Sequence, residues 1–174
     1  MSKYLLLILA VLGGGLIILF NGKNKSKEES NEVIVGASSF LKEPLEEMKE
    51  AYEKINNGAK VKLIFNQSSK LEEEIVRGVK MDIFIAYKEK YTDYIVDVGI
   101  AEESDVKSFG DTQVFYKKDL TESQNLESDI KDEEKFKYTV IRLSNNFLAN
   151  KFMAFVESKE GEAILKKYSL IRKK

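Results

Sequence analysis

The chain has no cysteine, no histidine and no tryptophan, and only one of its 174 residues is proline. Without cysteine it has no disulfide and no thiol nucleophile, and without histidine it has no imidazole base and no ordinary zinc site. An enzyme would then depend on Ser–Lys or paired-carboxylate chemistry, and the sequence shows no recognisable pattern for either. We therefore predict that the protein is not an enzyme and that it carries no cofactor.

An excess of charge of either sign is also absent, because 28 basic residues accompany 29 acidic ones and the net charge is −1. Such a chain has no long-range field that would attract nucleic acid, and evenly mixed charges usually form the solvated face of surface helices. The length is sufficient for one domain with a proper core. We expect one folded domain that does not bind nucleic acid.

One long apolar run extends from residue 4 to residue 20 and contains no charged side chain. A helix of that length spans about 26 Å, slightly less than the ~30 Å hydrocarbon core of a membrane. Lys3 precedes the run, and three lysines follow it. We predict a transmembrane signal-anchor at residues 1–22, with a cleaved signal peptide as the alternative, and a polar spacer at residues 23–32.

From residue 33 onward, short apolar strands alternate with amphipathic helices. Residues 33–37, 61–65 and 82–86 are predicted to be strands, and each is followed by apolar residues at helical spacing. These residues are Leu45, Met48, Tyr52 and Ile55 in the first helix, Leu71, Ile75 and Val79 in the second, and Tyr91, Tyr94, Ile95 and Val98 in the third.

Two further strands are predicted at residues 113–117 and 138–143, and two further helices at about 146–157 and 158–168. This alternation predicts an α/β fold, a three-layer αβα sandwich with a mainly parallel sheet and helices on both faces, within residues 33–174. A charged, polar linker is expected at about residues 118–135. The aromatic and aliphatic side chains of the last two helices have helical spacing, so we expect core packing from Phe147, Phe152, Phe155, Ile164, Leu165 and Tyr168.

A pair of serines, Ser68 and Ser69, lies where the strand at 61–65 passes into the next helix. In open α/β sheets ligands bind at the carboxyl ends of the strands, and a helix N-terminus there favours anions. The pair therefore indicates a candidate anion site. Ser69 and Glu72 also have the spacing of a capping box, so we expect Ser69 to cap the helix, with contact to the anion as its alternative role.

The same stretch carries a family resemblance. From Phe65 the order is an aromatic residue, a polar pair, a serine, two residues and a leucine, then Ile–x–x–Gly–x–x–x–Asp–x–Phe–Ile. This order resembles the molybdate/tungstate-binding proteins, which are the solute-binding components of ABC importers. Residues 36–54 resemble the first loop and helix of that family, and residues 145–170 resemble its C-terminal helix pair.

The resemblance implies a periplasmic-binding-protein-like fold, an extracytoplasmic location and an ABC importer permease as a partner. It also implies that a tetrahedral oxyanion, molybdate or tungstate, is held without counter-charges by hydroxyl and backbone N–H groups of two lobes. The lysines that follow the apolar run favour the opposite membrane orientation by the positive-inside rule.

The chain departs from the family at residues 118–135. In the family, a whole second lobe is built between the strand that leaves the first lobe and the strand that returns to it. Here only twenty residues separate the two predicted strands, and a lobe with its own core needs at least several tens. We therefore expect one lobe, with the second lobe missing.

The resemblance places Ser68 at the second-loop serine of the family. In the first loop, an alignment without gaps places Phe40 at the ligand position, and an apolar ring there would leave a dianion poorly solvated. A shift of one residue instead brings Ser39 to that position, with Ser38 next to it. Ser39 is equally suited to cap the first helix.

Two functions follow as hypotheses. The first is a membrane-anchored solute-binding protein that binds an oxyanion through Ser68, Ser39, Ser38 and Ser69, alone or by pairing of lobes in a homodimer. The second is a one-lobe interaction module that has lost the ligand and contacts a membrane partner or another copy through the apolar surface of its former hinge.

Overall fold

The computed structural model describes residues 31–116 and 133–170. The predicted signal-anchor, most of the spacer and most of the linker lie outside the described residues. The elements are β1 Glu32–Ser38, η1 Ser39–Leu41, α2 Lys42–Ile55, β2 Lys60–Asn66, α3 Ser68–Val76, β3 Ile83–Ala86, α4 Glu89–Asp97, η2 Glu103–Asp105, β4 Val106–Tyr116, β5 Glu133–Arg142, α5 Phe147–Val156 and α6 Lys159–Lys167.

The strands form one mixed sheet in the order β2-β1-β3-β5-β4. β1 pairs in parallel with β2 and β3, whereas β5 runs antiparallel to both β3 and β4. Four strands therefore share one direction, as the prediction of a mainly parallel sheet requires, and β5 alone is reversed. The reversal matches the pairing of β5 with β4, the strand that precedes it in the chain, because consecutive strands that pair with each other usually run antiparallel.

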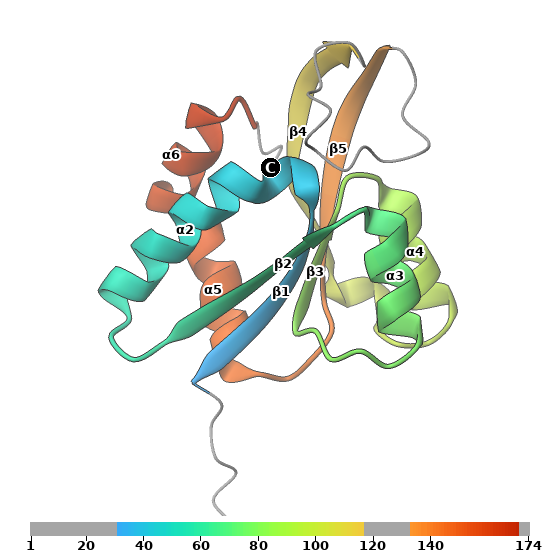
Figure 1. Cartoon of the computed structure of the whole chain (residues 1–174), viewed down its shortest axis with the longest axis horizontal. Helices are drawn as coiled ribbons and strands as arrows, with labels where there is room; N and C mark the ends of the chain where they lie inside the picture. Colours follow the sequence, from blue (N-terminus) through green and yellow to red (C-terminus); the bar gives the residue numbers. More distant parts are fainter. Residues whose placement is uncertain (1–30, 117–132, 171–174) are drawn as a thin grey trace, which may run out of the picture.

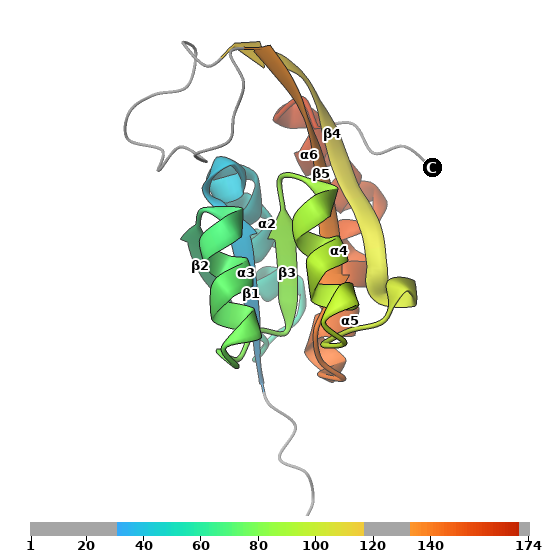
Figure 2. The same ribbon diagram turned by 90° about the vertical axis from the view of Figure 1, so that its right-hand side faces the viewer.

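The helices cover both faces of this sheet. α2, α5 and α6 lie on one face, and α3 and α4 lie on the other (Figures 1 and 2). The predicted three-layer αβα sandwich is confirmed, and the described residues form one such lobe.

The last two strands are longer than the sequence pattern indicated. They pair from Val106 opposite Ile141 to Tyr116 opposite Glu133, with register shifts on the way. The resulting two-stranded ribbon extends beyond the rest of the sheet (Figure 2). The end of the predicted linker is therefore part of β5, because backbone pairing with β4 compensates for the polar sequence.

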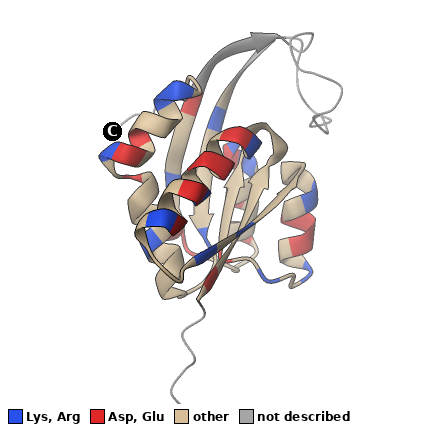
Figure 3. Ribbon diagram, turned by 60° about the vertical axis from the view of Figure 1, so that its left-hand side comes forward, with Lys and Arg blue, Asp and Glu red and all other residues tan. Residues whose placement is uncertain are grey.

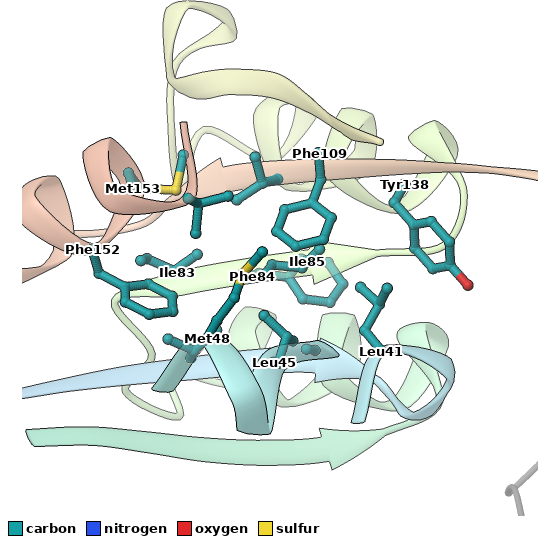
Figure 4. Close-up of a cluster of buried hydrophobic side chains, with 14 of the residues drawn as sticks. Leu41, Leu45, Met48, Ile83, Phe84, Ile85, Phe109, Tyr138, Phe152 and Met153 are labelled. Atoms are coloured by element: carbon teal, nitrogen blue, oxygen red, sulfur yellow. The ribbon is translucent and has the colours of Figure 1, made fainter. Parts of the chain in front are cut away.

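The main core lies between α2, α5 and the sheet. Leu45 and Met48 of α2 are completely buried and point toward the strands, where Phe109 lies opposite them (Figure 4). Phe152 of α5 is also completely buried, and its ring meets the edge of the Tyr52 ring at 5.3 Å between centroids. Burial of each such side chain contributes on the order of 2 kcal/mol, so this helix face holds α2 on the sheet.

Some residues of the predicted helical stripes are not core residues. Ile55 is 60% exposed and Phe147 is 55% exposed. They are the last residue of α2 and the first residue of α5, so they project past the edge of the sheet. Tyr94 and Val98 are likewise exposed, and Val79 lies beyond the end of α3. Helical spacing identified the correct face but not where each helix passes beyond the strands.

Asp82 joins three strands at the point where the parallel and antiparallel parts of the sheet meet. Its carboxylate accepts hydrogen bonds from the Ile34 backbone N–H at 2.8 Å and from the Ser144 hydroxyl at 2.6 Å. Its backbone N–H donates to the carbonyl of Ile34, and its carbonyl accepts from Leu143. The Asp82 side chain is 1% exposed, and these bonds compensate for the burial of its carboxylate.

Glycine turns and a serine cap mark the ends of several helices. Gly58 and Gly99 have positive φ angles just after α2 and α4, a conformation that favours glycine. Ser158 caps α6, and its hydroxyl accepts a hydrogen bond from the Gly161 backbone N–H at 3.2 Å.

Among the described residues, no helix is both long enough and apolar enough to cross a membrane.

Gly161 provides a test of the contact between α5 and α6. A Cβ atom on Gly161 would lie 2.5 Å from the backbone carbonyl oxygens of Phe155 and Val156, and neither can move without shifting α5. We expect Gly161→Ala to lower the free energy of unfolding by about 1–3 kcal/mol, measured by urea denaturation. The exposed neighbour substitution Glu160→Ala is the control and should change it by less than about 0.5 kcal/mol. Equal effects of the two variants would contradict this packing.

The ion pair between Arg142 of β5 and Asp105 of η2 makes stability depend on pH. Nε of Arg142 donates to Asp105 at 2.9 Å, Nη2 donates to the same oxygen, and these bonds hold the pKa of the Asp105 carboxyl below its usual value. A lowered folded-state pKa adds stability above the unfolded-state pKa of about 3.9, and this stability is lost as the pH falls through the folded-state pKa.

We expect Asp105→Asn to lower the free energy of unfolding by on the order of 1 kcal/mol at pH 7. The difference from the original protein should shrink as the pH falls below 4, when Asp105 itself is protonated. Urea denaturation at several pH values measures this, and Glu157→Gln, which removes the exposed pair with Lys107, is the control. A difference that stays constant down to pH 2 would contradict the role of the pair.

Candidate functional site

Three loops meet at the carboxyl edge of the parallel strands, which we define as the ends of β1, β2 and β3. Ser38, the last residue of β1, lies opposite Asn66, the last residue of β2, and Ala37 lies opposite Ile85 of β3. η1 and α2 follow β1, α3 follows β2, and α4 follows β3. The first turns of these helices therefore begin at the same edge of the sheet (Figure 1).

Ser68 joins two of these loops. It is the first residue of α3, and its side chain is completely buried. Its hydroxyl oxygen accepts a hydrogen bond from the backbone N–H of Tyr87, at 3.2 Å, in the loop that follows β3. Ser68 thus lies at the predicted edge and at the start of a helix. Its predicted contact with an anion stays a prediction.

The predicted capping box of Ser69 and Glu72 is wrong. α3 begins at Ser68 with Gln67 as its N-cap residue, and no side chain accepts a hydrogen bond there. The carbonyl of Gln67 instead accepts from the backbone N–H groups of Lys70 and Leu71. Because the helix begins earlier than the pattern indicated, Ser69 lies inside the first turn, half-buried.

The first loop contains Ser38 and Ser39, and the structure gives them different surroundings. Ser38 ends β1 and is completely buried, whereas Ser39 is half-buried and begins the short 3-10 turn η1. The alternative role of Ser39 as a cap of α2 is wrong, because Leu41 is the N-cap residue and no side-chain cap bond is made. Ligand contact by Ser38 and Ser39 stays a prediction.

Aromatic rings border the same loops. The half-buried Phe40 ring is stacked on Phe136 of β5, with centroids 5.1 Å apart and an interplanar angle of 17°. It meets Tyr87 edge-on at 6.2 Å, and Tyr87 in turn contacts Phe136 and Tyr91. Phe40 is therefore part of an aromatic cluster, which we define as Phe40, Tyr87, Tyr91, Phe136 and Tyr138.

Sequence reasoning missed two members of this region. Tyr87 directly follows the buried strand Ile83–Ala86, and this position after a strand was a signal that it lies at the carboxyl edge. Phe136 was assigned next to the polar linker, and no local pattern connected it with Phe40. Their association depends on the strand order, which places β5 beside β3.

Positive charge is also present at this edge. Lys88 Nζ lies 4.9 Å from the centre of the Tyr87 ring, and Lys90 Nζ lies 4.7 Å from that of Tyr91. Burial raises the pKa of the Glu72 carboxyl, Glu73 adds to this, and the charge of Lys90 opposes it, so Lys90 acts on the first turns of α3. Both lysines directly follow β3 in the sequence, but no pattern there marked them as site residues.

This arrangement suits an anion better than a metal ion. The start of a helix presents backbone N–H groups and a partial positive charge, serine hydroxyls add directional donors, and the two lysines add full charges. Within the described residues, no cluster of acidic side chains is placed to hold a metal ion. The edge has the chemistry of a site for a small, multiply charged anion.

Residues 33–117 match the family model of bacterial extracellular solute-binding proteins. The matched part runs from β1 to the end of β4, so it contains all three loops of the carboxyl edge. This part of the chain therefore has the sequence pattern of a solute-binding protein, a class that normally acts by binding. No curated protein sequence matches the chain.

Solved structures agree on the fold. A chain described as the substrate-binding domain of a molybdenum ABC transporter from Clostridium difficile has a TM-score of 0.67 and 15% identity, over 82% of this chain and 99% of that one. The periplasmic molybdate-binding protein of Azotobacter vinelandii has a TM-score of 0.66 and 11% identity, over 82% and 100%. An ABC-type phosphate transport receptor from Vibrio cholerae has a TM-score of 0.58 and 8% identity, over 82% and 100%.

These identities are low, so the similarity is one of fold. The similar structures include proteins named for molybdate and a protein named for phosphate, and they do not distinguish between the two ligands. The choice of ligand has to be argued from the residues of this chain.

Proposed function

We propose that the protein is an extracytoplasmic solute-binding protein that binds a small tetrahedral oxyanion, molybdate or tungstate, at the carboxyl edge and presents it to an ABC importer permease. One observation carries the proposal. The loops that contain Ser38, Ser39 and Ser68 begin at paired strand ends, and the buried Ser68 hydroxyl is fixed by the backbone of the third loop. Fixed hydroxyl and N–H donors lose little entropy when an anion binds.

The location and the tether belong to the same proposal. The apolar run at residues 4–20 lies outside the described residues, and we propose that it anchors the lobe to the cell membrane or acts as a cleaved signal peptide. Either form is compatible with uptake, because the lobe would work on the outer side of the membrane, where its ligand is found.

One lobe limits the affinity. An open edge does not exclude water, so each neutral hydrogen bond to the anion contributes only on the order of 1 kcal/mol. Lys88 and Lys90 offset part of this loss, since charge-assisted bonds are roughly twice as strong as neutral ones. We therefore expect dissociation constants between micromolar and millimolar for one lobe, and tighter binding where two lobes pair in a homodimer.

Binding of molybdate, tungstate, sulfate and phosphate to the full chain, measured by calorimetry, tests the proposal. We expect Ser68→Ala to weaken molybdate binding by about 10- to 100-fold, because a hydrogen bond to a charged group is worth about 1.5–3 kcal/mol. Ser39→Ala should weaken it less, because Ser39 is only half-buried.

Ser144→Ala is the matched control, since the Ser144 hydroxyl also bonds a buried group, Asp82, but at the opposite edge of the sheet. It should leave the affinity unchanged. Absence of binding below millimolar anion, or equal losses in Ser68→Ala and Ser144→Ala, would rule out the proposed site.

A second function is favoured by the stacking of Phe40 on Phe136. Phe40 is the residue that an alignment without gaps places at the ligand position, and its ring lies in an aromatic cluster that borders the serine loops. The second candidate is therefore an interaction module that has kept the lobe, lost the ligand and contacts a partner or another copy near this cluster.

Phe40→Ser separates the two functions. If the ring only restricts the site, the substitution should strengthen molybdate binding by roughly tenfold, because an apolar neighbour of the anion is replaced by a donor. If the cluster forms an interface, the same variant should instead shift the oligomeric state toward monomer in light scattering and reduce crosslinking in membranes. A monomeric chain without crosslinked partners counts against the second function.

A further inference from the structure

Exposed apolar side chains gather where β1, β2 and β3 begin, an edge that we call the amino edge. Ile55 is 60% exposed at the end of α2, and Phe147 is 55% exposed at the start of α5. With the exception of Tyr94, the other large exposed apolar side chains of the described residues lie in or just after the last turns of α3 and α4, namely Val76, Val79, Val98 and Ile100.

The topology brings these distant residues together. Each helix that follows a parallel strand returns to the edge where the next strand begins, so α2, α3 and α4 all end at the amino edge (Figure 1). β5 runs in the opposite direction, so it ends there and α5 starts there. The side chains therefore belong to one end of the molecule, opposite the serine loops.

A groove of about 820 Å³ opens at this edge. Asn31, Asn57, Lys80, Phe147 and Lys151 contribute to its lining. The Lys151 Nζ atom lies 4.7 Å from the centre of the exposed Phe147 ring, so a cation and an apolar ring face solvent together.

The exposed charged residues that line the groove, Lys80 and Lys151, are both basic. The acidic residue of the lining, Asp82, is buried and bonded within the sheet. Outside the groove the edge carries charges of both signs, since Glu32 begins β1 and Glu53 lies in the last turn of α2, and acidic and basic segments alternate along the helices (Figure 3). The groove itself therefore combines an apolar ring with positive charge.

The chain also enters the lobe at this edge. Asn31 lines the groove, and it follows the apolar run at residues 4–20 by a stretch of ten residues. Even a fully extended stretch of that length spans at most about 36 Å. If the run lies in a membrane, the amino edge is the part of the lobe that is held nearest to the lipid.

We propose that the amino edge lies against the surface of a phospholipid bilayer that contains anionic lipid. Exposed apolar side chains with lysines beside them suit the headgroup region, where the apolar side chains enter the acyl boundary and the cations contact phosphate. The serine loops at the carboxyl edge then face away from the bilayer. This surface is distinct from the proposed oxyanion site, and its placement rests on the membrane anchor of the proposed function at residues 4–20.

The absence of cysteine allows a direct test with the full chain in lipid nanodiscs. A polarity-sensitive dye is attached to Asn57→Cys at the amino edge and, as a matched position, to Lys42→Cys at the start of α2 on the carboxyl edge. Both residues are exposed. The discs carry phosphatidylglycerol together with lipids that bear a quencher on the headgroup, and each disc holds one chain.

We expect the dye at position 57 to be quenched at least threefold more than the dye at position 42, since the headgroup region is only roughly 5–8 Å deep on each side. Lys80→Glu and Lys151→Glu should each lower the ratio of docked to undocked lobes at least about fivefold. A basic residue near an anionic surface contributes roughly 1 kcal/mol to binding, and reversing its charge costs more than removing it. Ile55→Asp should reduce quenching as well.

One control is matched in chemistry. Lys166→Glu reverses an exposed lysine of α6 and should not change the quenching. Circular dichroism checks that each variant is folded. Equal quenching at both dye positions, indifference to Lys80→Glu and Lys151→Glu, or loss of the chain from the discs would overturn the inference. Quenching that occurs only when a disc holds two chains would also overturn it, because the amino edge would then contact a second copy of the chain and not the lipid.

Discussion

The buried carboxylate of Asp82 is the constraint on which the rest of this lobe depends. It accepts from the backbone of β1 and from Ser144 just after β5, while its own backbone continues the ladders on both sides. A buried carboxylate without partners would be costly, so these bonds favour one register between strands of opposite direction. The bonds of Asp82 thus hold β5 beside β3. The arrangement of side chains at both the carboxyl edge and the amino edge depends on this pairing of β3 with β5.

At the carboxyl edge, the consequence is a meeting of serines, aromatic rings and lysines from segments far apart in the sequence. Ser68 is held by the backbone of Tyr87, and Phe40 stacks on Phe136 only because β5 lies next to β3. Donors that suit an anion and rings that suit an interface therefore share one edge. The serine hydroxyl and backbone N–H donors favour an oxyanion, whereas apolar rings next to them would leave an anion poorly solvated.

The two edges of the sheet have different characters for the same topological reason. The helices α2, α3 and α4 begin at the carboxyl edge, where their N–H groups favour negative charge, and they end at the amino edge, where Ile55 and Val76 project past the strands. A lobe of this kind thus separates a polar, donor-rich end from an end with apolar tips and basic side chains. The lobe is suited to contact a small anion at one end and an extended surface at the other.

The sequence by itself determined the approximate positions of the strands and helices in residues 33–98 and the edge on which Ser68 lies. These features depend on apolar periodicity and turn chemistry, which are local. It did not determine the start of α3, and so the capping role of Ser69 was wrong, because a backbone carbonyl satisfied the first turn. The ribbon of β4 and β5, the partner of Phe40 and the exposure of Ile55 and Phe147 were decided by the tertiary structure. Each depends on which strand pairs with which and where a helix passes the edge of the sheet, and contacts between distant residues leave no local pattern.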